Sequence, residues 1–422
     1  MRRLLTLMLP PGAAAAAVAA VLVGVVLVSR GGDEPFEIST GASTTTSSTA
    51  TTTTTTTIAT TIPPTTRISP AALAFLADPA HPDPDGNRRS VVTTSTMATT
   101  TTTAPPPTTK ASPAPVRIPS PSCAAGLAAP TNQTAPFTGQ SASIPAGLPA
   151  VVVKVSNNNS SSRAALIGLD QADVVFEERI EARATRFAAV FHSKLPANVG
   201  PVRSGRTTDI QIMRNLGTPV LGYSGSNNGV AGQLANGAAN GWFVPFINTD
   251  RAPFARDGRY RAPDNLFVDP TSLGACGNGG TPYAIFKHGA ATSTTAQPAS
   301  SVSLDARSPY RFDWDAGSGR WLRTQDGSAH ATRTGERLAP KNVVVLFVRY
   351  TPSAVDAASV DAETIGTGIA WVLRDGTITT GSWSRTRGAD GYLVTDGAGV
   401  EVSLAPGNTW VVLAPANSAN WS

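Results

Sequence analysis

The chain has little cysteine, little histidine and no pattern typical of a metal site. Only two cysteines occur in 422 residues, Cys123 and Cys276, and the four histidines are scattered: His81, His192, His288 and His330. Neither set has the spacing of zinc ligands, so the sequence predicts no metal and no cofactor. Two cysteines permit one disulfide in an oxidising compartment. Whether Cys123 and Cys276 form it stays open, because the sequence does not give their separation in space.

Charged residues are also scarce, at 14% of the chain, and aromatic residues make up 6%. The formal net charge is +5, but Lys and Arg do not gather in runs interleaved with aromatic residues. Such runs are typical of nucleic-acid binding, so we expect no nucleic-acid partner. A weak attraction to anionic polymers of the cell envelope stays open.

Uncharged residues dominate the beginning of the chain. The run GAAAAAVAAVLVGVVLVS at 12–29 is close to the length needed to cross a bilayer as a helix, and Arg2 and Arg3 precede it. We expect 1–30 to be a signal anchor, with a cleaved signal peptide as the alternative. No cysteine lies near the end of the run, which excludes lipid attachment there. The signal anchor predicts a protein of the cell membrane, and both alternatives predict that the remaining chain is extracytoplasmic.

A segment rich in Thr and Pro follows, with stretches such as TTTTTTTIATTIPPTT. A segment of this composition cannot bury enough apolar surface to offset the entropy lost on ordering. We therefore expect a disordered stalk at 31–122, extended by its proline and threonine content.

The remainder has the periodicity of a folded module, which we divide into an N-terminal α/β region at 140–295 and a mostly β region at 303–422. Ordered structure is expected from about Pro149, where PAVVVKVSN predicts a buried strand, and DVVFEERIEARATRFAAVF predicts two more. We expect little regular structure at 241–269 and a flexible segment at SLGACGNGG. Further along, KNVVVLFVRY predicts a central strand and Asp375-Gly376 a hairpin turn. The predicted fold class is α/β (α+β) with layered mixed sheets.

The segment NVGPVRSGRTTDIQ, at 198–211, concentrates hydrogen-bonding groups in one loop. Arg203 and Arg206 could grip a carboxylate or phosphate in bidentate geometry. A helix start near them would add free backbone N–H groups to an anion site. The alternative is internal pairing with Glu177 and Glu181, since buried charges need partners. Both interpretations stay open.

Catalysis has less support from the residues. Glu177 and Glu181 lie four apart on one face of a predicted strand and could form an acid–base pair acting on a glycan, but Arg179 lies between them. Ser204 would need a positioned base to act as a nucleophile, and His192 is the nearest in sequence. No catalytic residue is assigned. Three tryptophans could form a stacking platform for sugars or belong to the core: Trp371, Trp383 and Trp410.

Several segments resemble a known family in their order along the chain: GLDQADVVFEE, TRFAAVFHSK, VGPVRSGRTTDI, RAPDNLF, KNVVVLFV, DGTITTGSW and LAPGNTWVVLAP. From Ala150 to its end the chain resembles the YerB-like bacterial lipoproteins, known as domain of unknown function 3048, in both N- and C-terminal regions. The resemblance implies a membrane-tethered, extracytoplasmic α/β protein without an established activity. Two features depart from the family: the anchor lacks a lipid-modified cysteine, and Ala182-Arg183 replaces Gly-Gly. The second puts a tight hairpin turn there in doubt.

The candidate ligand site consists of polar residues at positions that match the family's motifs: Asn157, Asp173, Glu177, Glu181, Arg186, Arg203, Ser204, Arg206, Asp209, Arg261, Asp264 and Asn265. We expect an envelope protein that binds an anionic wall polymer, or a cell-wall assembly partner, in a cleft between the Arg203/Arg206 loop and the segment 261–265. One alternative is a hydrolase or transferase that acts on envelope glycans with Glu177 or Glu181. The other is a purely structural, stalked spacer.

Overall fold

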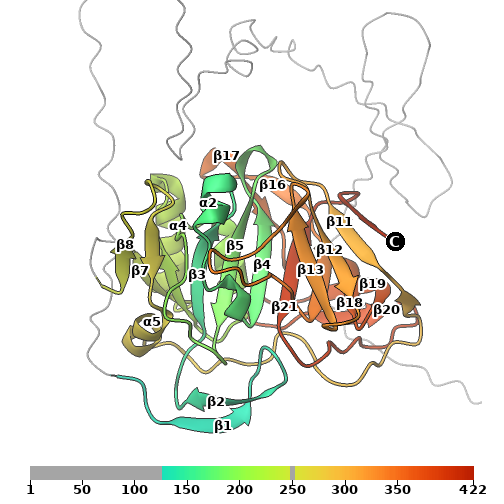
Figure 1. Ribbon diagram of the computed structural model, residues 1–422. Helices are drawn as coiled ribbons and strands as arrows, with labels where there is room; N and C mark the ends of the chain where they lie inside the picture. The colour runs from blue at the N-terminus through green and yellow to red at the C-terminus, as the bar shows by residue number, and fades with distance from the viewer. Residues whose placement is uncertain (1–125, 248–251) are drawn as a thin grey trace, which may run out of the picture. The chain divides into compact units, whose positions relative to one another are not determined.

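The computed structural model describes residues 126–247 and 252–422, and one large mixed sheet organises them (Figure 1). Its eleven strands are, in chain order, β3 (Val151–Ser156), β4 (Val174–Arg179), β5 (Thr185–Phe191), β6 (Val220–Tyr223), β7 (Val244–Ile247), β10 (Gln297–Pro298), β15 (Asn342–Phe347), β18 (Gly366–Arg374), β19 (Thr377–Arg385), β20 (Leu393–Asp396) and β21 (Thr409–Ala414). The order across the sheet is β10-β19-β18-β15-β21-β4-β5-β3-β6-β7, and β20 pairs with β19.

The sheet draws its strands from both halves of the folded chain. β21, near the end of the chain, pairs in parallel with β15 on one side and with β4 on the other, where Val411 lies opposite Phe176. The regions at 140–295 and 303–422 therefore share one continuous sheet. The protein is mostly β with few helices, so the expected layered mixed sheets are confirmed, while the helical content is lower than an α/β class implies.

One face of the large sheet packs against a second, five-stranded sheet. That sheet has the order β14-β13-β12-β11-β22, with β11 (Ser301–Leu304), β12 (Tyr310–Asp315), β13 (Arg320–Gln325), β14 (Ser328–Ala329) and β22 (Ala419–Trp421). Phe187 and Val412 of the large sheet join one apolar cluster with Phe312 and Trp321 of the smaller sheet. Burying side chains of this size contributes about 1.5–3 kcal/mol each, which holds the two layers together.

Helices and a hairpin cover part of the opposite face. Residues that alternate with the first cluster, such as Val152 and Val411, pack against Ile212 of α3 (Thr207–Met213) and Leu234 of α4 (Asn228–Ala239). Beside these helices lies a two-stranded hairpin of β16 (Tyr350–Ser353) and β17 (Asp356–Ala362). The alternation of side chains along each strand thus sends consecutive residues into two different cores.

Ordered structure begins earlier than the expected Pro149. β1 (Pro130–Thr134) and β2 (Ser141–Pro145) form an antiparallel pair around the buried Ala135 and Ile144. Most residues of this pair are exposed, so their apolar periodicity is weak and the pattern did not predict strands.

The segment expected to lack regular structure contains three strands. β7 lies at the edge of the large sheet, and β8 (Phe254–Arg256) pairs with β9 (Leu266–Val268). The segment expected to be flexible holds the end of α5 (Pro270–Cys276). Asp269 caps this helix by accepting hydrogen bonds from the N–H groups of Thr271 and Ser272, and proline occupies its first turn, which is a helix-start signal that the flanking glycines obscured.

Two hairpin turns use left-handed backbone conformations. The turn between β18 and β19 has Asp375 at φ 48° and Gly376 at φ 74°, which confirms the predicted hairpin. Between β4 and β5, Ala182 and Arg183 adopt φ 51° and 60°. A tight turn therefore forms there without glycine, and the doubt raised by the missing Gly-Gly pair is corrected. The remaining short helices are α2 (Ser160–Ala164) and two 3₁₀ turns, η1 (Leu169–Gln171) and η2 (Glu181–Arg183).

Several predictions concern residues outside the described part of the chain. These are the membrane anchor at 1–30, the stalk at 31–122 and Cys123. Among the described residues, no helix combines the length and apolar character needed to span a membrane. Cys276 is disulfide-bonded and mostly buried at the end of α5.

Candidate functional site

The loop that carries Arg203 and Arg206, which we call the arginine loop, lies at the carboxyl edge of the parallel strands β3 and β6. Arg203 donates its backbone N–H to the Lys154 carbonyl of β3 at 2.9 Å, and its own carbonyl accepts from Ser224, just after β6, at 3.0 Å. The loop thus fills the space between the ends of β3 and β6. In open sheets with parallel strands, ligands bind in the crevice outside this edge. The loop therefore lies where a ligand site is expected.

A buried cluster of charges lies beneath the loop, around Lys154. Its Nζ donates to Glu178 Oε1 at 2.5 Å and to Asp209 Oδ1 at 2.7 Å, and all three side chains are 0% exposed. Burial raises the pKa of Glu178 to about 7, the charge of Asp209 adds to this rise, and Lys154 opposes it. Sequence reasoning included Asp209 but missed Lys154 and Glu178. The signal was the single lysine in the apolar strand VVVKVS, because a buried lysine needs a partner.

Arg206 connects this cluster to the surface. Its backbone N–H donates to Asp209 Oδ2 at 2.7 Å, and its guanidinium pairs with Glu181 at 2.8 Å. Ser359 of β17 donates to the other Glu181 oxygen at 2.7 Å. Burial alone would raise the pKa of Glu181, but the hydrogen bond and charge of Arg206 outweigh it, so the pKa is lowered.

Arg203 turns toward a different carboxylate. It pairs with Asp264 at 3.2 Å, and both side chains are less than a tenth exposed. Of the neighbouring residues in the RAPDNLF segment, Arg261 is exposed and accepts from the Asp264 N–H through its carbonyl at 2.9 Å, and the Asn265 side chain accepts a hydrogen bond from Arg256 at 2.9 Å. The side chains of Arg203 and Arg206 are thus largely buried, at 4% and 7% exposure, and each pairs with a carboxylate of the described chain.

Glu177 belongs to another site, because alternation along β4 sends it to the opposite face from Glu178. Arg323 of the second sheet donates to both Glu177 oxygens, at 2.9 and 3.1 Å, and Trp410 Nε1 donates to Oε2 at 2.8 Å. Burial raises the pKa of Glu177, although Arg323 opposes the rise. Thr185 also donates to Glu177, at 2.8 Å. Glu177 and Glu181 therefore do not form an acid–base pair facing a common substrate.

The Arg323 guanidinium is enclosed by rings, with the centroids of Tyr310 and Trp410 at 4.4 and 5.2 Å. Asn157 joins the same network by donating to Thr185 Oγ1 at 2.7 Å. Contacts with rings stabilise a buried cation, so this network holds the two sheets together. Trp410 and Trp383 are both 2% exposed, and neither is available for stacking on a sugar.

The remaining candidates lie at two places. Arg186 is fully buried and donates to the Ser204 carbonyl at 3.3 Å, beneath the arginine loop. Asp173 accepts from the backbone N–H groups of His192 and Ser193 at 2.8 and 2.7 Å, after the end of β5. Because β5 runs antiparallel to β3, His192 lies at the far end of the sheet from Ser204 and cannot serve it as a base.

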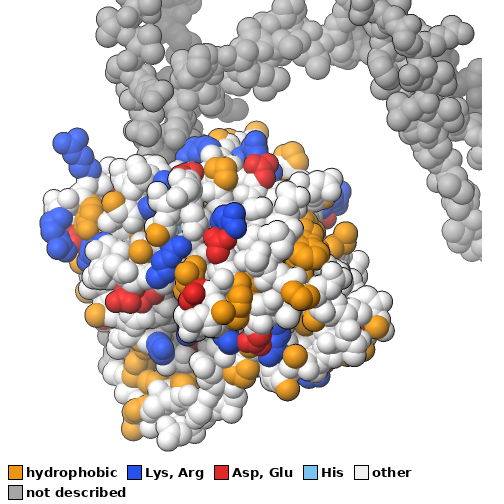
Figure 2. Space-filling view, turned by 45° about the vertical axis from the view of Figure 1, so that its right-hand side comes forward, with side chains coloured by type: hydrophobic (Ala, Val, Ile, Leu, Met, Phe, Trp, Pro, Cys, Tyr) orange, Lys and Arg blue, Asp and Glu red, His pale blue; other side chains and the backbone are white. Residues whose placement is uncertain are grey.

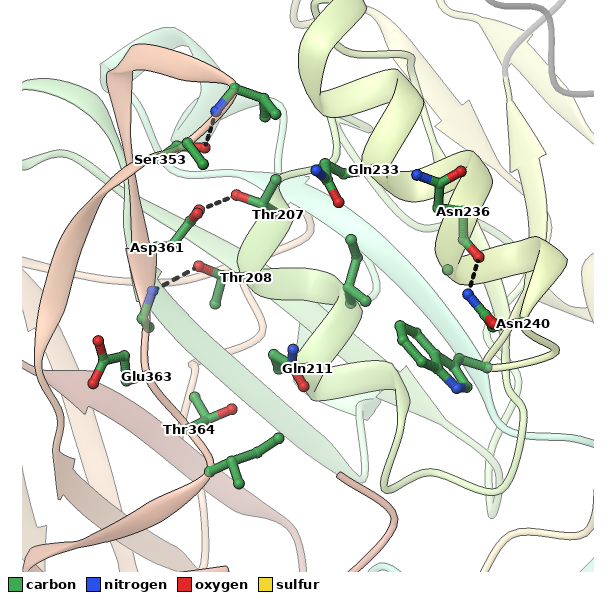
Figure 3. A pocket seen from close by; sticks show the side chains of 17 residues that line it. Thr207, Thr208, Gln211, Gln233, Asn236, Asn240, Ser353, Asp361, Glu363 and Thr364 are labelled. Atoms are coloured by element: carbon green, nitrogen blue, oxygen red, sulfur yellow. Dashed lines mark hydrogen bonds between the residues drawn. The ribbon is translucent and has the colours of Figure 1, made fainter. Parts of the chain in front are cut away.

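A groove opens beside the buried cluster, between α3, α4 and the β16–β17 hairpin, with a volume of about 640 Å³ (Figure 3). Helix α4 and its C-cap residue present amides at positions i, i+3 and i+7: Gln233, Asn236 and Asn240, of which Asn240 donates to the Asn236 carbonyl at 2.8 Å. Residues with this spacing share one face of a helix. Gln211 of α3 and Trp242, which follows α4, also line the groove. In the sequence NNGVAGQLANGAANG these amides recur at helical spacing, which is the signal that could have indicated the groove.

The hairpin supplies the opposite wall of the groove. Thr207 donates to Asp361, and the Ala362 N–H donates to Thr208 Oγ1 at 3.0 Å, so the two threonines after the arginine loop tie α3 to β17. Gln233 is half-buried and Asn236 is exposed, and no hydrogen bond joins either side-chain amide to another residue within the described part of the chain. Their donors and acceptors are therefore available to a ligand.

The groove offers hydrogen bonds, charge and one aromatic ring. Arg214 lies 4.3 Å from the ring centroid of Trp242 and fixes the indole at the end of the groove. The described lining includes no histidine, cysteine or lysine, which are the usual activating bases and nucleophiles. The described residues also contain no group of His, Cys, Asp and Glu that could hold a metal ion. On the face seen in Figure 2, acidic and basic side chains lie interspersed.

Comparisons with known proteins identify the family of this chain. Two family models match, "Protein of unknown function (DUF3048) N-terminal domain" over residues 137–281 and its C-terminal domain over 300–411, together more than half of the chain. The Bacillus subtilis (strain 168) protein named "Putative lipoprotein YerB" is 26% identical over 282 residues, which is 63% of this chain and 81% of that protein. The crystal structure of YerB from Bacillus subtilis has a TM-score of 0.58 and 22% identity, and the match covers 69% of this chain and 99% of that one. The chain therefore belongs to the YerB-like family defined by the two DUF3048 domains.

Proposed function

We propose that this protein is a membrane-tethered, extracytoplasmic envelope protein that binds a glycan in the groove between α3, α4 and the β16–β17 hairpin. The apolar run at 12–29 and the lipoprotein name of the Bacillus subtilis relative support the tethered location. The observation that carries the ligand class is the stripe of amides on α4, at Gln233, Asn236 and Asn240.

Amide side chains suit a ligand rich in hydroxyl groups. Each amide offers two donors and an acceptor, and each sugar hydroxyl can donate and accept, so neighbouring hydroxyls can be matched along the stripe. An indole at one end adds an apolar surface with a polar edge. Gln233 is half-buried and Asn236 is exposed, so both amides can exchange hydrogen bonds to water for hydrogen bonds to a glycan bound in the groove.

The charges of the groove argue against an anionic polymer. Its ionisable lining residues within the described part of the chain are Asp361 and Glu363, of which Glu363 pairs with Arg349, while Arg203 and Arg206 are buried in ion pairs of their own. A phosphate-rich or carboxylate-rich chain would meet like charge there. A neutral or cationic glycan fits better.

The buried arginines have a supporting part in this proposal. Arg206 and Asp209 fix the start of α3, from which Thr207 and Thr208 bind the hairpin wall. The family-like segment VGPVRSGRTTDI would then hold the walls of the groove in place without contacting the ligand.

A binding measurement tests the proposal. The probe is the β-1,4-linked tetramer of N-acetylglucosamine, titrated calorimetrically into the 422-residue chain in detergent. Replacing both Gln233 and Asn236 with Ala removes hydrogen bonds worth about 0.5–1.5 kcal/mol each, so affinity should fall about tenfold. Asn420→Ala, an exposed amide on β22, is the matched control and should leave affinity unchanged. Absence of binding, or equal affinity in the double variant, would contradict the proposal.

A further inference from the structure

The two acidic residues of the groove differ in how they are paired. Glu363 is held by Arg349 in a bidentate ion pair, with contacts of 2.7 and 2.9 Å. Asp361 accepts a hydrogen bond from Thr207 through Oδ1, and within the described part of the chain it has no ion-pair partner. The groove therefore keeps one carboxylate whose charge is not balanced by a cation.

Asp361 also lies at a central place in the groove. It projects from β17 toward α3, across from the amide stripe of α4, and Figure 3 shows its side chain directed at Thr207 between the two walls. Thr207 fixes one carboxylate oxygen and leaves Oδ2 for another donor. Asp361 is only partly exposed, and the attraction between charges is screened less there than on an open surface.

We propose that Asp361 recognises the free ammonium group of an amino sugar, so that the groove selects a glycan containing de-N-acetylated residues. This inference rests on the proposed glycan-binding function and adds the substrate class. The ammonium group donates to Asp361 Oδ2 while the neighbouring hydroxyls meet the amides of α4. An N-acetylated residue presents a neutral amide at the same place and lacks the charge, and a phosphorylated residue is repelled.

Two matched tetramers test the inference: β-1,4-linked glucosamine and β-1,4-linked N-acetylglucosamine, titrated into the 422-residue chain at about pH 6, where a primary amine is protonated. We expect the glucosamine tetramer to bind about tenfold more tightly, which corresponds to about 1.4 kcal/mol. The advantage should shrink as salt screens the ion pair. In Asp361→Asn the two tetramers should bind with equal affinity. Asp313→Asn, a half-buried Asp on β12 that pairs with Arg311, is the control and should keep the difference.

The outcomes separate this inference from the function on which it rests. If the acetylated tetramer binds and the glucosamine tetramer binds no better, the inference is wrong and glycan binding remains supported. If neither tetramer binds, both are wrong. An advantage for glucosamine that persists in Asp361→Asn would place the ammonium site elsewhere. The comparison of tetramers on the unsubstituted chain needs no variant, so a folding defect in Asp361→Asn would not remove the test.

Discussion

Lys154 of β3 reaches over β5 to pair with Glu178 of β4, at 2.5 Å and fully buried. The residue opposite Lys154 on β5 is Ala188, whose small side chain leaves room for the lysine to cross. Asp209 of α3 binds the same Nζ, so one lysine joins two strands and the helix that carries Thr207 and Thr208. This contact links the interior of the sheet to one wall of the groove.

Removing the lysine should destabilise the fold strongly. Lys154→Met leaves Glu178 and Asp209 buried without their cation, and the loss of one partner from a buried ion pair costs about 3–5 kcal/mol. The free energy of unfolding, from urea denaturation, checks this expectation. Glu178→Gln combined with Lys154→Met should recover part of the loss, because one uncompensated charge is removed. A change below about 1 kcal/mol in Lys154→Met would show that the cluster is not structurally important.

Stability should fall as pH rises through the range in which Glu178 titrates. The pKa of Glu178 is raised from 4.5 to about 7 in the folded protein, so the folded state holds a proton that the unfolded state has already lost. Between these values each additional pH unit lowers the free energy of unfolding by up to about 1.4 kcal/mol. Glu178→Gln should lessen this decline.

Asp173 should also lower the free energy of unfolding as pH rises, but over a lower pH range, because burial raises its pKa from 3.8 to about 6. A residual decline below about pH 6 should therefore persist in Glu178→Gln. Urea denaturation at several pH values measures both slopes. Identical slopes in the two proteins above about pH 6 would contradict the assignment to Glu178.

A glycine in the turn between β4 and β5 should stabilise the fold. Ala182 adopts φ 51° and ψ 34°, a left-handed conformation that disfavours a side chain. Ala182→Gly should raise the free energy of unfolding by about 0.5–1 kcal/mol, after allowance for the greater freedom of glycine in the unfolded chain. Ala184→Gly is the matched control. Ala184 has an extended backbone with φ −68°, which does not favour glycine, so this variant should have a lower free energy of unfolding. A loss of stability in Ala182→Gly would contradict the account of this turn.

Two glycines of α4 should respond in opposite ways to alanine. A Cβ at Gly229 would lie 2.3 Å from the Val355 carbonyl of the hairpin, so Gly229→Ala must push the hairpin away from α4 and weaken the groove. A Cβ at Gly232 would meet nothing within 4 Å. Gly232→Ala should therefore stabilise the helix, by up to about 1 kcal/mol. Thermal unfolding and binding of the N-acetylglucosamine tetramer measure both effects, and equal results for the two variants would contradict the described packing.

The sequence predicted those parts of the fold that local periodicity controls. The strands at β3, β4, β5 and β15 follow from continuous or alternating apolar residues, and the β18–β19 turn follows from Asp375-Gly376. It did not predict that β21 enters the sheet beside β4, because strand order depends on contacts far apart in the chain.

The candidate site shows the same limit. Arg206 and Asp209 share a short segment, so their proximity could be expected, but Glu177 pairs with Arg323, which lies 146 residues further along the chain. Glu178 lies on the face of β4 that Val174 and Phe176 share, and it was not among the predicted site residues. The groove joins residues from α3, α4 and β17, and no single segment contains enough of them to form a motif.

The most direct test of the central claim is hydrogen–deuterium exchange of the 422-residue chain with and without the N-acetylglucosamine tetramer. Exchange reports the opening of backbone hydrogen bonds segment by segment, so it locates the bound glycan without any substitution. We predict slower exchange in α4 and β17, at Asn228–Ala239 and Asp356–Ala362, and no change in the five-stranded sheet. Unchanged exchange at a saturating concentration of the tetramer, or protection confined to other segments, would contradict the claim that this groove binds a glycan.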